Sequence, residues 1–331
     1  MRLPRGDNMT TYADMVYMLG GVPALAGVPF GPKAKYYFVD PSSALASDSN
    51  AGLDLERPLA SLEAAEDKCV AGQHDTVFFV AGATADNPTA AIVWDKDYTH
   101  LIGVGSQLPG VGQRCRVVLE AATAVTPVIT FSGDGCIVKN MQFNQEKATG
   151  AASGVAIVTG HRNYFKNVFF MCPTSATAAS YSLKVGGTEN AFVRCTIGQH
   201  TLVRSAATYG LWLYVGDDDC QRNKFINCEF LSWASGGGTA HTLVYVDVDI
   251  DVEVYTAFFE NCLFSNIGAA DLAVGIDDNC AETDHRLYLR GRNNCFAGCT
   301  AVAAPLTYVL TPDMNGDHAT SGLLMIAVTE T

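Results

Sequence analysis

The hexapeptide FINCEF at 225–230 belongs to a pattern that recurs along the second half of the chain and decides its fold. Most copies begin and end with an apolar residue, carry a polar residue, usually asparagine, third, and a small or apolar residue, often cysteine, fourth. The copies are VKNMQF (138–143), FKNVFF (165–170), FVRCTI (192–197), FINCEF (225–230), FENCLF (259–264) and the degenerate FAGCTA (296–301). Their third positions lie 27, 27, 33, 34 and 37 residues apart. Such a return of residue types is typical of a repeat architecture.

A solenoid of β-coils explains this spacing, because each turn lays one copy about 4.8 Å above the last in a parallel ladder. The first and last positions then form apolar columns inside the solenoid. The asparagines are predicted to form a ladder of side-chain amides at a bend, with the members Asn140, Asn167, Asn227 and Asn261. The fourth positions predict a column of core packing, because equivalent coils offer no closed cage of four metal ligands. That column consists of Met141, Val168, Cys195, Cys228, Cys262 and Cys299.

Composition narrows the class of protein. The chain has 331 residues, 48% of them hydrophobic and 31 of them glycine, which suits an elongated domain of strands and turns. A formal charge of −13 argues against nucleic acid or an anionic membrane as a partner, since phosphate contacts need clustered Lys and Arg. Glycines and prolines interrupt the apolar stretch 15–30, so we expect neither a signal peptide nor a membrane-spanning helix. The 11 cysteines favour buried free thiols.

The first half of the chain supplies the predicted beginning of the solenoid. The runs 75–82, 100–105 and 116–120 have the composition of strands, and 58–70 predicts a short helix that starts at Pro58 and caps the open end. The segments YFVDP (37–41), GLD (52–54), PLASL (58–62) and DTVF (75–78) resemble the N-terminal cap and first coil of pectate-lyase-like β-helix proteins. The resemblance implies an all-β fold, a right-handed single-stranded parallel β-helix.

The same reasoning gives a domain organisation. We expect an N-terminal arm at 1–35 and one parallel β-helix domain at 36–331. Within that domain, 36–82 is the cap and first coil, 83–303 the coils, and 304–331 a C-terminal cap or closing strands.

Clusters of acidic residues are the candidates for a catalytic or metal-binding site. The segment 244–254 alternates strictly, which predicts a strand with Asp247, Asp249, Asp251 and Glu253 on one face. Carboxylates two residues apart on a strand lie about 7 Å from each other, a separation that suits an inverting glycosidase, and oxygen ligands also suit Ca²⁺. The alternative is a solvated face that keeps a β-prone strand from aggregating.

Two further acidic clusters lie in predicted loops. Asp217, Asp218 and Asp219 follow Gly216 after an apolar run, where a loop leaves a coil, and they are the other candidate acids if the protein is an enzyme. A plain turn sequence explains them equally well. A mixed cluster at 277–286 has the composition of a hydrolase site but no recognisable spacing. The Gly-His-Gly string of polygalacturonases is absent, GHR at 160–162 being the nearest match, so we assign no catalytic residue, no metal and no cofactor.

The arm differs in kind from the solenoid. Residues 11–19 predict a short helix ended by two glycines, followed by a Pro- and Gly-rich link at 22–32. Such a helix cannot bury its apolar side chains alone, so it either docks on another protein or folds back on the solenoid. The candidate partner-binding residues are Tyr12, Met15, Val16, Tyr17, Met18 and Leu19.

An arm ahead of a β-helix resembles virion proteins of tailed phages. The resemblance implies a non-enzymatic capsid cement or decoration protein, made in the host cytoplasm, located on the capsid surface and assembled as a homotrimer. Its partner would be the major capsid protein. Two alternatives stay open: a tailspike or polysaccharide lyase or hydrolase acting on host glycans, and a glycan-binding tail fibre or adhesin without turnover. The three tryptophans, Trp94, Trp212 and Trp233, are not clustered in sequence.

Overall fold

The computed structural model describes most of the chain from Lys33 onward. The described residues are 33–105, 115–120, 126–146, 153–171, 177–204, 206–215, 220–234, 241–248, 257–268, 271–280, 287–290, 293–304, 309–310 and 324–326. The predicted arm helix and its six partner-binding residues therefore lie outside the described residues, as do the three aspartates at 217–219 and Asp249.

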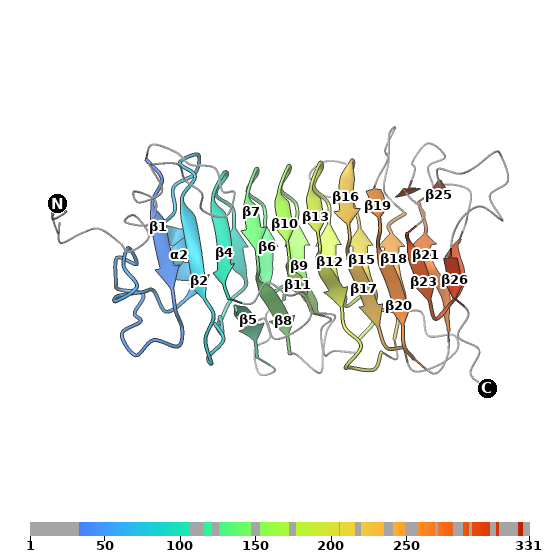
Figure 1. Ribbon diagram of the computed structural model, residues 1–331, viewed down its shortest axis with the longest axis horizontal. Helices are drawn as coiled ribbons and strands as arrows, with labels where there is room; N and C mark the ends of the chain where they lie inside the picture. The colour runs from blue at the N-terminus through green and yellow to red at the C-terminus, as the bar shows by residue number, and fades with distance from the viewer. Residues whose placement is uncertain are drawn as a thin grey trace, which may run out of the picture.

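Three parallel sheets run the length of the molecule, and successive strands of the chain pass from one sheet to the next (Figure 1). Sheet A contains β1 (Tyr36–Val39), β2 (Thr76–Val80), β4 (His100–Val104), β7 (Ile137–Lys139), β10 (Tyr164–Lys166), β13 (Ala191–Val193), β16 (Asn223–Ile226), β19 (Ala257–Glu260), β22 (Leu287–Arg290) and β25 (Val309–Leu310). Sheet B contains β5 (Arg116–Leu119), β8 (Gln142–Gln145), β11 (Phe169–Phe170), β14 (Thr196–Gly198), β17 (Glu229–Ser232), β20 (Leu263–Asn266), β23 (Cys295–Ala297) and β26 (Leu324–Ile326). Sheet C contains β3 (Ile92–Trp94), β6 (Ile129–Phe131), β9 (Gly154–Val158), β12 (Tyr181–Val185), β15 (Tyr209–Leu213), β18 (Thr242–Val246), β21 (Leu272–Asp278) and β24 (Cys299–Ala304).

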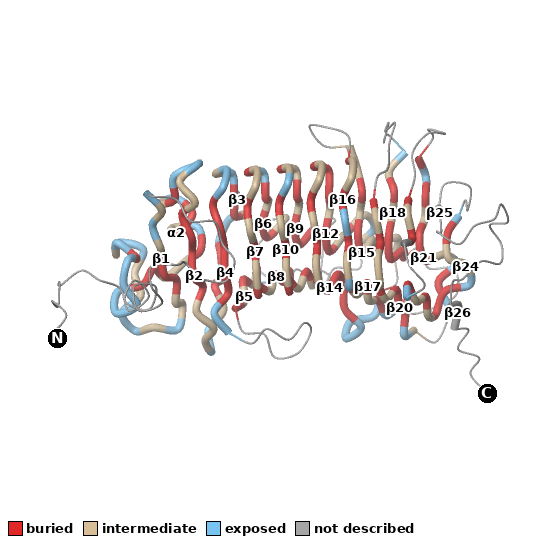
Figure 2. Tube along the Cα trace, turned by 45° about the horizontal axis from the view of Figure 1, so that its top comes forward, coloured by how far each residue is buried: buried red, intermediate tan, exposed pale blue. Residues whose placement is uncertain are grey.

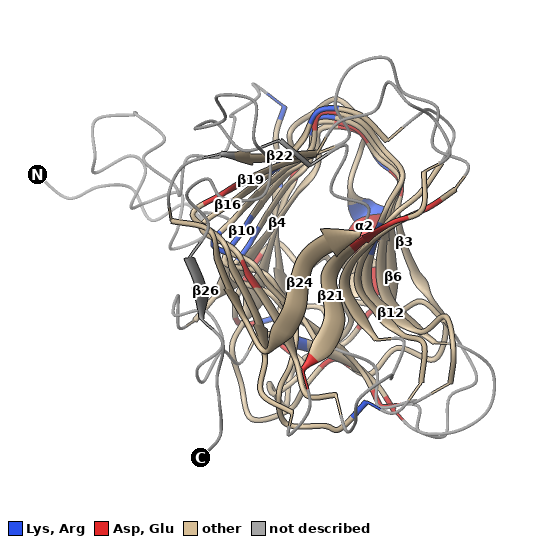
Figure 3. Ribbon diagram, turned by 90° about the vertical axis from the view of Figure 1, so that its right-hand side faces the viewer, with Lys and Arg blue, Asp and Glu red and all other residues tan. Residues whose placement is uncertain are grey.

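The predicted right-handed parallel β-helix is confirmed. Figure 3 looks along its axis and shows sheets A and C on different sides of the interior. The inward residues of all three sheets are buried, whereas the turns and outer faces are partly exposed (Figure 2). Within the described part of the chain, no helix has the length and hydropathy needed to cross a bilayer.

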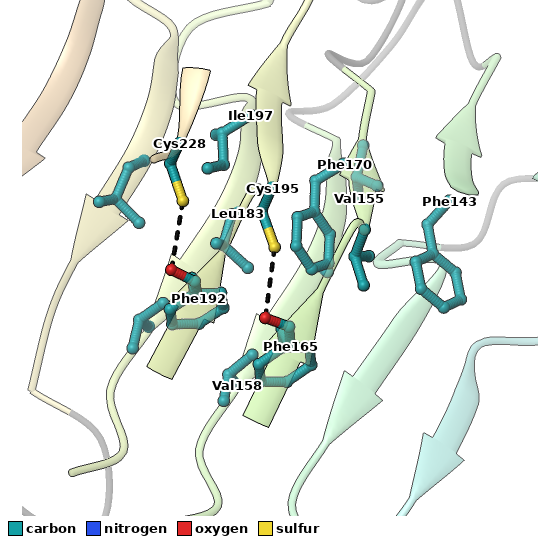
Figure 4. Packing of buried hydrophobic residues seen from close by; sticks show 14 of the residues in the cluster. Phe143, Val155, Val158, Phe165, Phe170, Leu183, Phe192, Cys195, Ile197 and Cys228 are labelled. Atoms are coloured by element: carbon teal, nitrogen blue, oxygen red, sulfur yellow. Dashed lines mark hydrogen bonds between the residues drawn. The ribbon is translucent and has the colours of Figure 1, made fainter. Parts of the chain in front are cut away.

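The predicted apolar columns fill the interior (Figure 4). Phe165, Phe192 and Phe225 are register partners on β10, β13 and β16, and neighbouring ring centroids lie 4.8 and 4.7 Å apart with planes within 5°. Phe230 stacks in the same way on Phe264 in sheet B, at 4.7 Å. Like residues therefore recur because they lie on top of one another.

The thiols in the core are free and buried, as predicted, except that Cys295 is partly exposed; this statement covers the cysteines in the described ranges. Cys195 Sγ donates to Phe165 O and Cys228 Sγ to Phe192 O, at 3.6 and 3.3 Å (Figure 4). Burial raises the pKa of the Cys228 thiol well above its ordinary value, so it stays protonated and unreactive.

The last coil corrects the predicted alignment. Phe296 pairs with Phe264 in sheet B, at 4.3 Å, rather than with Phe259 in sheet A, where Leu289 takes the place. Cys299 lies in β24 of sheet C, so it does not continue the thiol column. The next position above Cys262 is Asn294, whose Oδ1 accepts the Cys262 N–H at 2.8 Å. The FAGCTA match was misleading because leucine fills the sheet A column as well as phenylalanine does.

The predicted asparagine turn connects sheets A and B. Asn140, Asn167, Asn227 and Asn261 all have φ between 53° and 57°, the left-handed conformation that asparagine tolerates best after glycine. Asn167 Nδ2 donates to Asn140 Oδ1 at 3.1 Å, which confirms an amide contact between adjacent coils.

A second asparagine ladder was not predicted. Asn163, Asn190 and Asn223 are fully buried two residues before the sheet A phenylalanines. Asn190 Oδ1 accepts from the Asn163 backbone N–H and its Nδ2 donates to Gly160 O, at 2.9 and 3.0 Å. A Cβ on Gly160 would overlap Gly133 O, so only glycine fits this turn. These bonds satisfy backbone groups that would otherwise be buried without partners.

The short helix α2 (Leu62–Lys68) lies at the N-terminal end and contributes Leu62 and Ala65 to the core. It begins four residues later than predicted, because Leu59 forms a β-bridge with Val39 and its backbone is not available to a helix. Ser61 Oγ accepts from Ala64 N–H, and Asp86 Oδ2 accepts from Leu62 N–H at 2.7 Å.

Candidate functional site

The outer face of sheet C gathers aromatic side chains from adjacent coils. Along β12, β15 and β18, apolar residues such as Leu183, Leu211 and Val244 point into the core, so the residues that follow them point outward. We call five partly exposed residues the aromatic cluster: Tyr181, Tyr209, Trp212, Tyr214 and Tyr245.

The rings of the aromatic cluster contact one another in defined geometries. Tyr209 and Tyr245 are stacked with centroids 4.3 Å apart, and both meet Trp212 edge to face, at 5.0 and 5.8 Å. Tyr181 meets Trp212 in the same way at 5.9 Å and lies over Gly154, where a Cβ would overlap its ring. Edge-to-face and stacked pairs are the favourable arrangements of aromatic rings, so the members of the cluster stabilise one another's positions.

Two charged groups complete this face. Lys184 Nζ lies 3.9 Å from the ring centroids of both Trp212 and Tyr214. Burial lowers the Lys184 pKa, and Asp247 opposes that shift. Asp247 Oδ2 accepts the Trp212 indole N–H at 3.0 Å. The indole ring therefore has one cation over its face and one carboxylate at its edge.

The predicted strand at 244–254 is confirmed for Val244–Val246 but does not continue through the next two residues. Strand β18 ends at Val246, and Asp247 and Val248 lie beyond it in a turn rather than on an alternating strand. Asp247 Oδ1 accepts the Val248 backbone N–H at 2.8 Å, a local bond with which aspartate competes against strand pairing. Asp247 thus borders the aromatic cluster, whereas Asp249, Asp251 and Glu253 lie outside the described residues.

The acidic cluster predicted at 277–286 is only partly described. Asp277 is the register partner of Tyr245 on β21, and burial raises its pKa. Asp278 is buried. Residues 281–286 lie outside the described residues. Within the described ranges, no group of three or more His, Cys, Asp or Glu side chains is arranged to hold a metal ion.

Sequence reasoning missed the aromatic cluster because its members come from separate coils. Trp212 is alone in sequence, yet Lys184 and Tyr245 occupy the same register position one coil before and one coil after it. The sequence contained the necessary information, because residues one repeat apart lie side by side on adjacent coils. It would have required aligning outward positions as well as the inward phenylalanines.

Comparison with known proteins supports the fold. No family model and no curated protein matches the sequence. A rhamnogalacturonan lyase superposes with a TM-score of 0.54 at 15% identity, over 80% of this chain and 68% of that one. A pectin methylesterase in complex with a hexasaccharide gives 0.52 at 11% identity, over 90% and 91%. ORF18 of Geobacillus virus E2 gives 0.44 at 13% identity, over 96% and 64%, a likeness too weak to bear on function. The chain therefore has the pectate-lyase-like parallel β-helix fold, and at these identities the likeness extends to the fold alone.

Proposed function

We propose that the aromatic cluster binds a glycan chain and that the protein holds it without turnover. The observation that carries this proposal is the arrangement of five aromatic rings around Lys184 and Asp247 on one outer face. Sugar rings present apolar C–H faces and polar hydroxyls, so they are recognised by aromatic surfaces flanked by hydrogen-bonding groups. The aromatic cluster spans the adjacent strands β12, β15 and β18, so its surface extends over neighbouring coils as an extended polymer requires.

Replacing Trp212 with alanine is expected to weaken glycan binding at least about tenfold, because about 1.4 kcal/mol corresponds to a factor of ten and the indole is the centre of the cluster. Retention on a panel of immobilised acidic polysaccharides that includes polygalacturonate measures the change. Trp233, an exposed tryptophan beyond the end of β17, is the matched control, and W233A should bind like the unaltered protein. Equal binding by W212A and the unaltered chain would remove the proposal. Release of reducing ends or unsaturated products would replace it with the enzymatic alternative.

The second candidate is a capsid cement protein of a tailed phage, located on the capsid surface as a homotrimer. The observation that favours it is the apolar segment 12–19 ahead of the solenoid, which suits docking on the major capsid protein or another virion protein. A solenoid with one continuous apolar core suits a bridge between capsomers.

Deletion of residues 1–30 tests the cement role. The truncated protein is expected to lose its association with purified virions while its solenoid stays folded, since the described strands begin at Tyr36. Sedimentation of virions with bound protein gives the readout, and circular dichroism checks the fold. Undiminished association after the deletion would exclude anchoring by the arm.

A further inference from the structure

The outer face of sheet A carries one cation on each of four successive coils. Lys139 and Lys166 are register partners on β7 and β10, and the residue before each belongs to the core, so alternation points both lysines outward. Lys224 is exposed on β16, and Arg194 is exposed directly after the end of β13, the strand between β10 and β16. We call these four residues the basic face.

Carboxylates of the same sheet do not neutralise the basic face. The outward positions of β7, β10, β13 and β16 contain no Asp or Glu, and the first carboxylate in register is Glu260, one coil farther on. Among the described residues, Lys166, Arg194 and Lys224 form no ion pair. Burial lowers the pKa of Lys139, and the neighbouring Lys166 lowers it further, because like charges on adjacent coils repel. A bound anion relieves that repulsion.

The basic face contrasts with the formal charge of the whole chain, −13. At physiological ionic strength the Debye length is about 8 Å, so the charges nearest to a bound group decide whether it is attracted. A long polyanion meets the acidic rest of the chain as well as the basic face, whereas a short acidic segment meets the basic face alone. The charges therefore favour a short acidic segment.

Aliphatic side chains lie among the cations. Ile137, Val193 and Ile226 occupy outward positions of the same strands and are partly exposed. Val193 is the register partner of Lys166, so an apolar and a cationic side chain lie next to each other on adjacent coils. Burying aliphatic surface stabilises a complex only if the partner supplies apolar side chains, which a sugar polymer or a sugar-phosphate backbone lacks. The face therefore fits a protein segment that combines carboxylates with apolar residues.

The spacing of the cations matches an α-helix that lies along the solenoid axis. Adjacent coils are about 4.8 Å apart, and an α-helix advances about 5.4 Å per turn. A helix with carboxylates at i, i+4, i+7 and i+11 thus presents about one carboxylate per coil. Across four coils the two repeats diverge by only about 2 Å, which a lysine side chain can follow.

We infer that the basic face docks an acidic amphipathic helix of a partner protein, which runs along the solenoid axis and packs its apolar side chains on Ile137, Val193 and Ile226. Its carboxylates pair with successive cations, beginning with Lys139 and Lys166. This surface belongs to sheet A, so the inference goes beyond the proposed glycan binding, which concerns sheet C.

A synthetic helical peptide with glutamate at i, i+4, i+7 and i+11 and leucine beside these positions is the probe, and fluorescence anisotropy measures its binding to the full chain. The double variant Lys139→Gln with Lys166→Gln should bind the peptide at least about tenfold more weakly, because two charge-assisted contacts are lost. Lys68→Gln removes a cation from the last turn of α2 and is the matched control, which should bind like the unaltered chain. Failure of the unaltered chain to bind the peptide would overturn the inference, and so would equal binding by the double variant.

Charge reversal gives a result that misfolding cannot imitate. Lys139→Glu with Lys166→Glu should lose the glutamate peptide and gain binding to the same peptide with lysine in place of glutamate. Equal binding of a peptide with the same composition in scrambled order would rule out the helix. If the Lys139→Gln, Lys166→Gln variant loses binding to polygalacturonate or to an oligodeoxythymidylate while the peptide binds to neither chain, the basic face belongs to a polysaccharide or a nucleic acid and the inference is wrong.

Discussion

Replacing Phe192 with alanine is expected to lower the free energy of unfolding by about 3–5 kcal/mol. Phe192 is fully buried between Phe165 and Phe225, at 4.8 and 4.7 Å, with all three rings nearly parallel. The coil spacing is fixed by hydrogen bonds between strands, so the rings above and below cannot close the cavity. Urea unfolding at pH 7, followed by circular dichroism, measures the loss.

Phe169 supplies the control, because it lies on β11, in the coil before that of Phe192, and its side chain is only partly buried. Phe169→Ala should cost about 1 kcal/mol or less, since it removes an outward side chain and leaves no closed cavity. Similar losses for the two variants would mean that the phenylalanine column is not the main source of stability. A broad transition for Phe192→Ala alone would indicate that the coils on either side unfold separately.

The fold could be predicted from the sequence because each coil imposes the same packing requirement as the one before it. A residue such as Phe225 must match the coil below and the coil above, so the selection for phenylalanine recurs at each turn and is visible in the sequence. The same logic failed at Phe296. Sheets A and B both require apolar residues at their inner positions, and composition alone cannot tell which sheet a phenylalanine serves when the turn before it changes length.

The candidate site was less predictable for two physical reasons. The aromatic cluster depends on outward positions, where packing constrains residue type weakly, so Trp212 and Tyr245 do not form a repeated motif. The predicted row of carboxylates relied on alternation continuing past Val246, whereas the Asp247 side chain binds the next backbone N–H and ends the strand. Short-range side-chain bonds of this kind override periodicity.

Acidification from pH 7 to pH 5 is expected to lower the free energy of unfolding by about 2 kcal/mol, because two buried histidines are held neutral in the fold. Burial lowers the pKa of both His100 and His241 to about 3. Ile137 N–H donates to His100 Nδ1 at 3.2 Å, so protonation of that nitrogen removes an acceptor between β4 and β7. For His241, the nearby Arg204 guanidinium further disfavours a second positive charge.

The direction of this change in the free energy of unfolding follows from proton binding. Below about pH 6.5 an unfolded histidine takes up a proton that the folded one refuses, so stability is lost as pH falls, by about 2 kcal/mol per histidine at pH 5. Asp86 acts in the opposite direction. Burial raises its pKa to about 6, so the folded state binds a proton between pH 6 and pH 4. This proton uptake raises the free energy of unfolding by about 1 kcal/mol. Burial also raises the pKa of Glu66, which therefore stabilises the fold on acidification in the same way.

The double variant His100→Gln with His241→Gln separates these contributions. With both imidazoles removed, the carboxyl groups of Asp86 and Glu66 dominate, and the protein should become slightly more stable at pH 5 than at pH 7. Unfolding in urea at the two pH values gives the difference directly, and any general cost of the substitutions cancels because it is present at both. If the double variant loses as much stability on acidification as the unaltered chain, groups other than these histidines control the acid response.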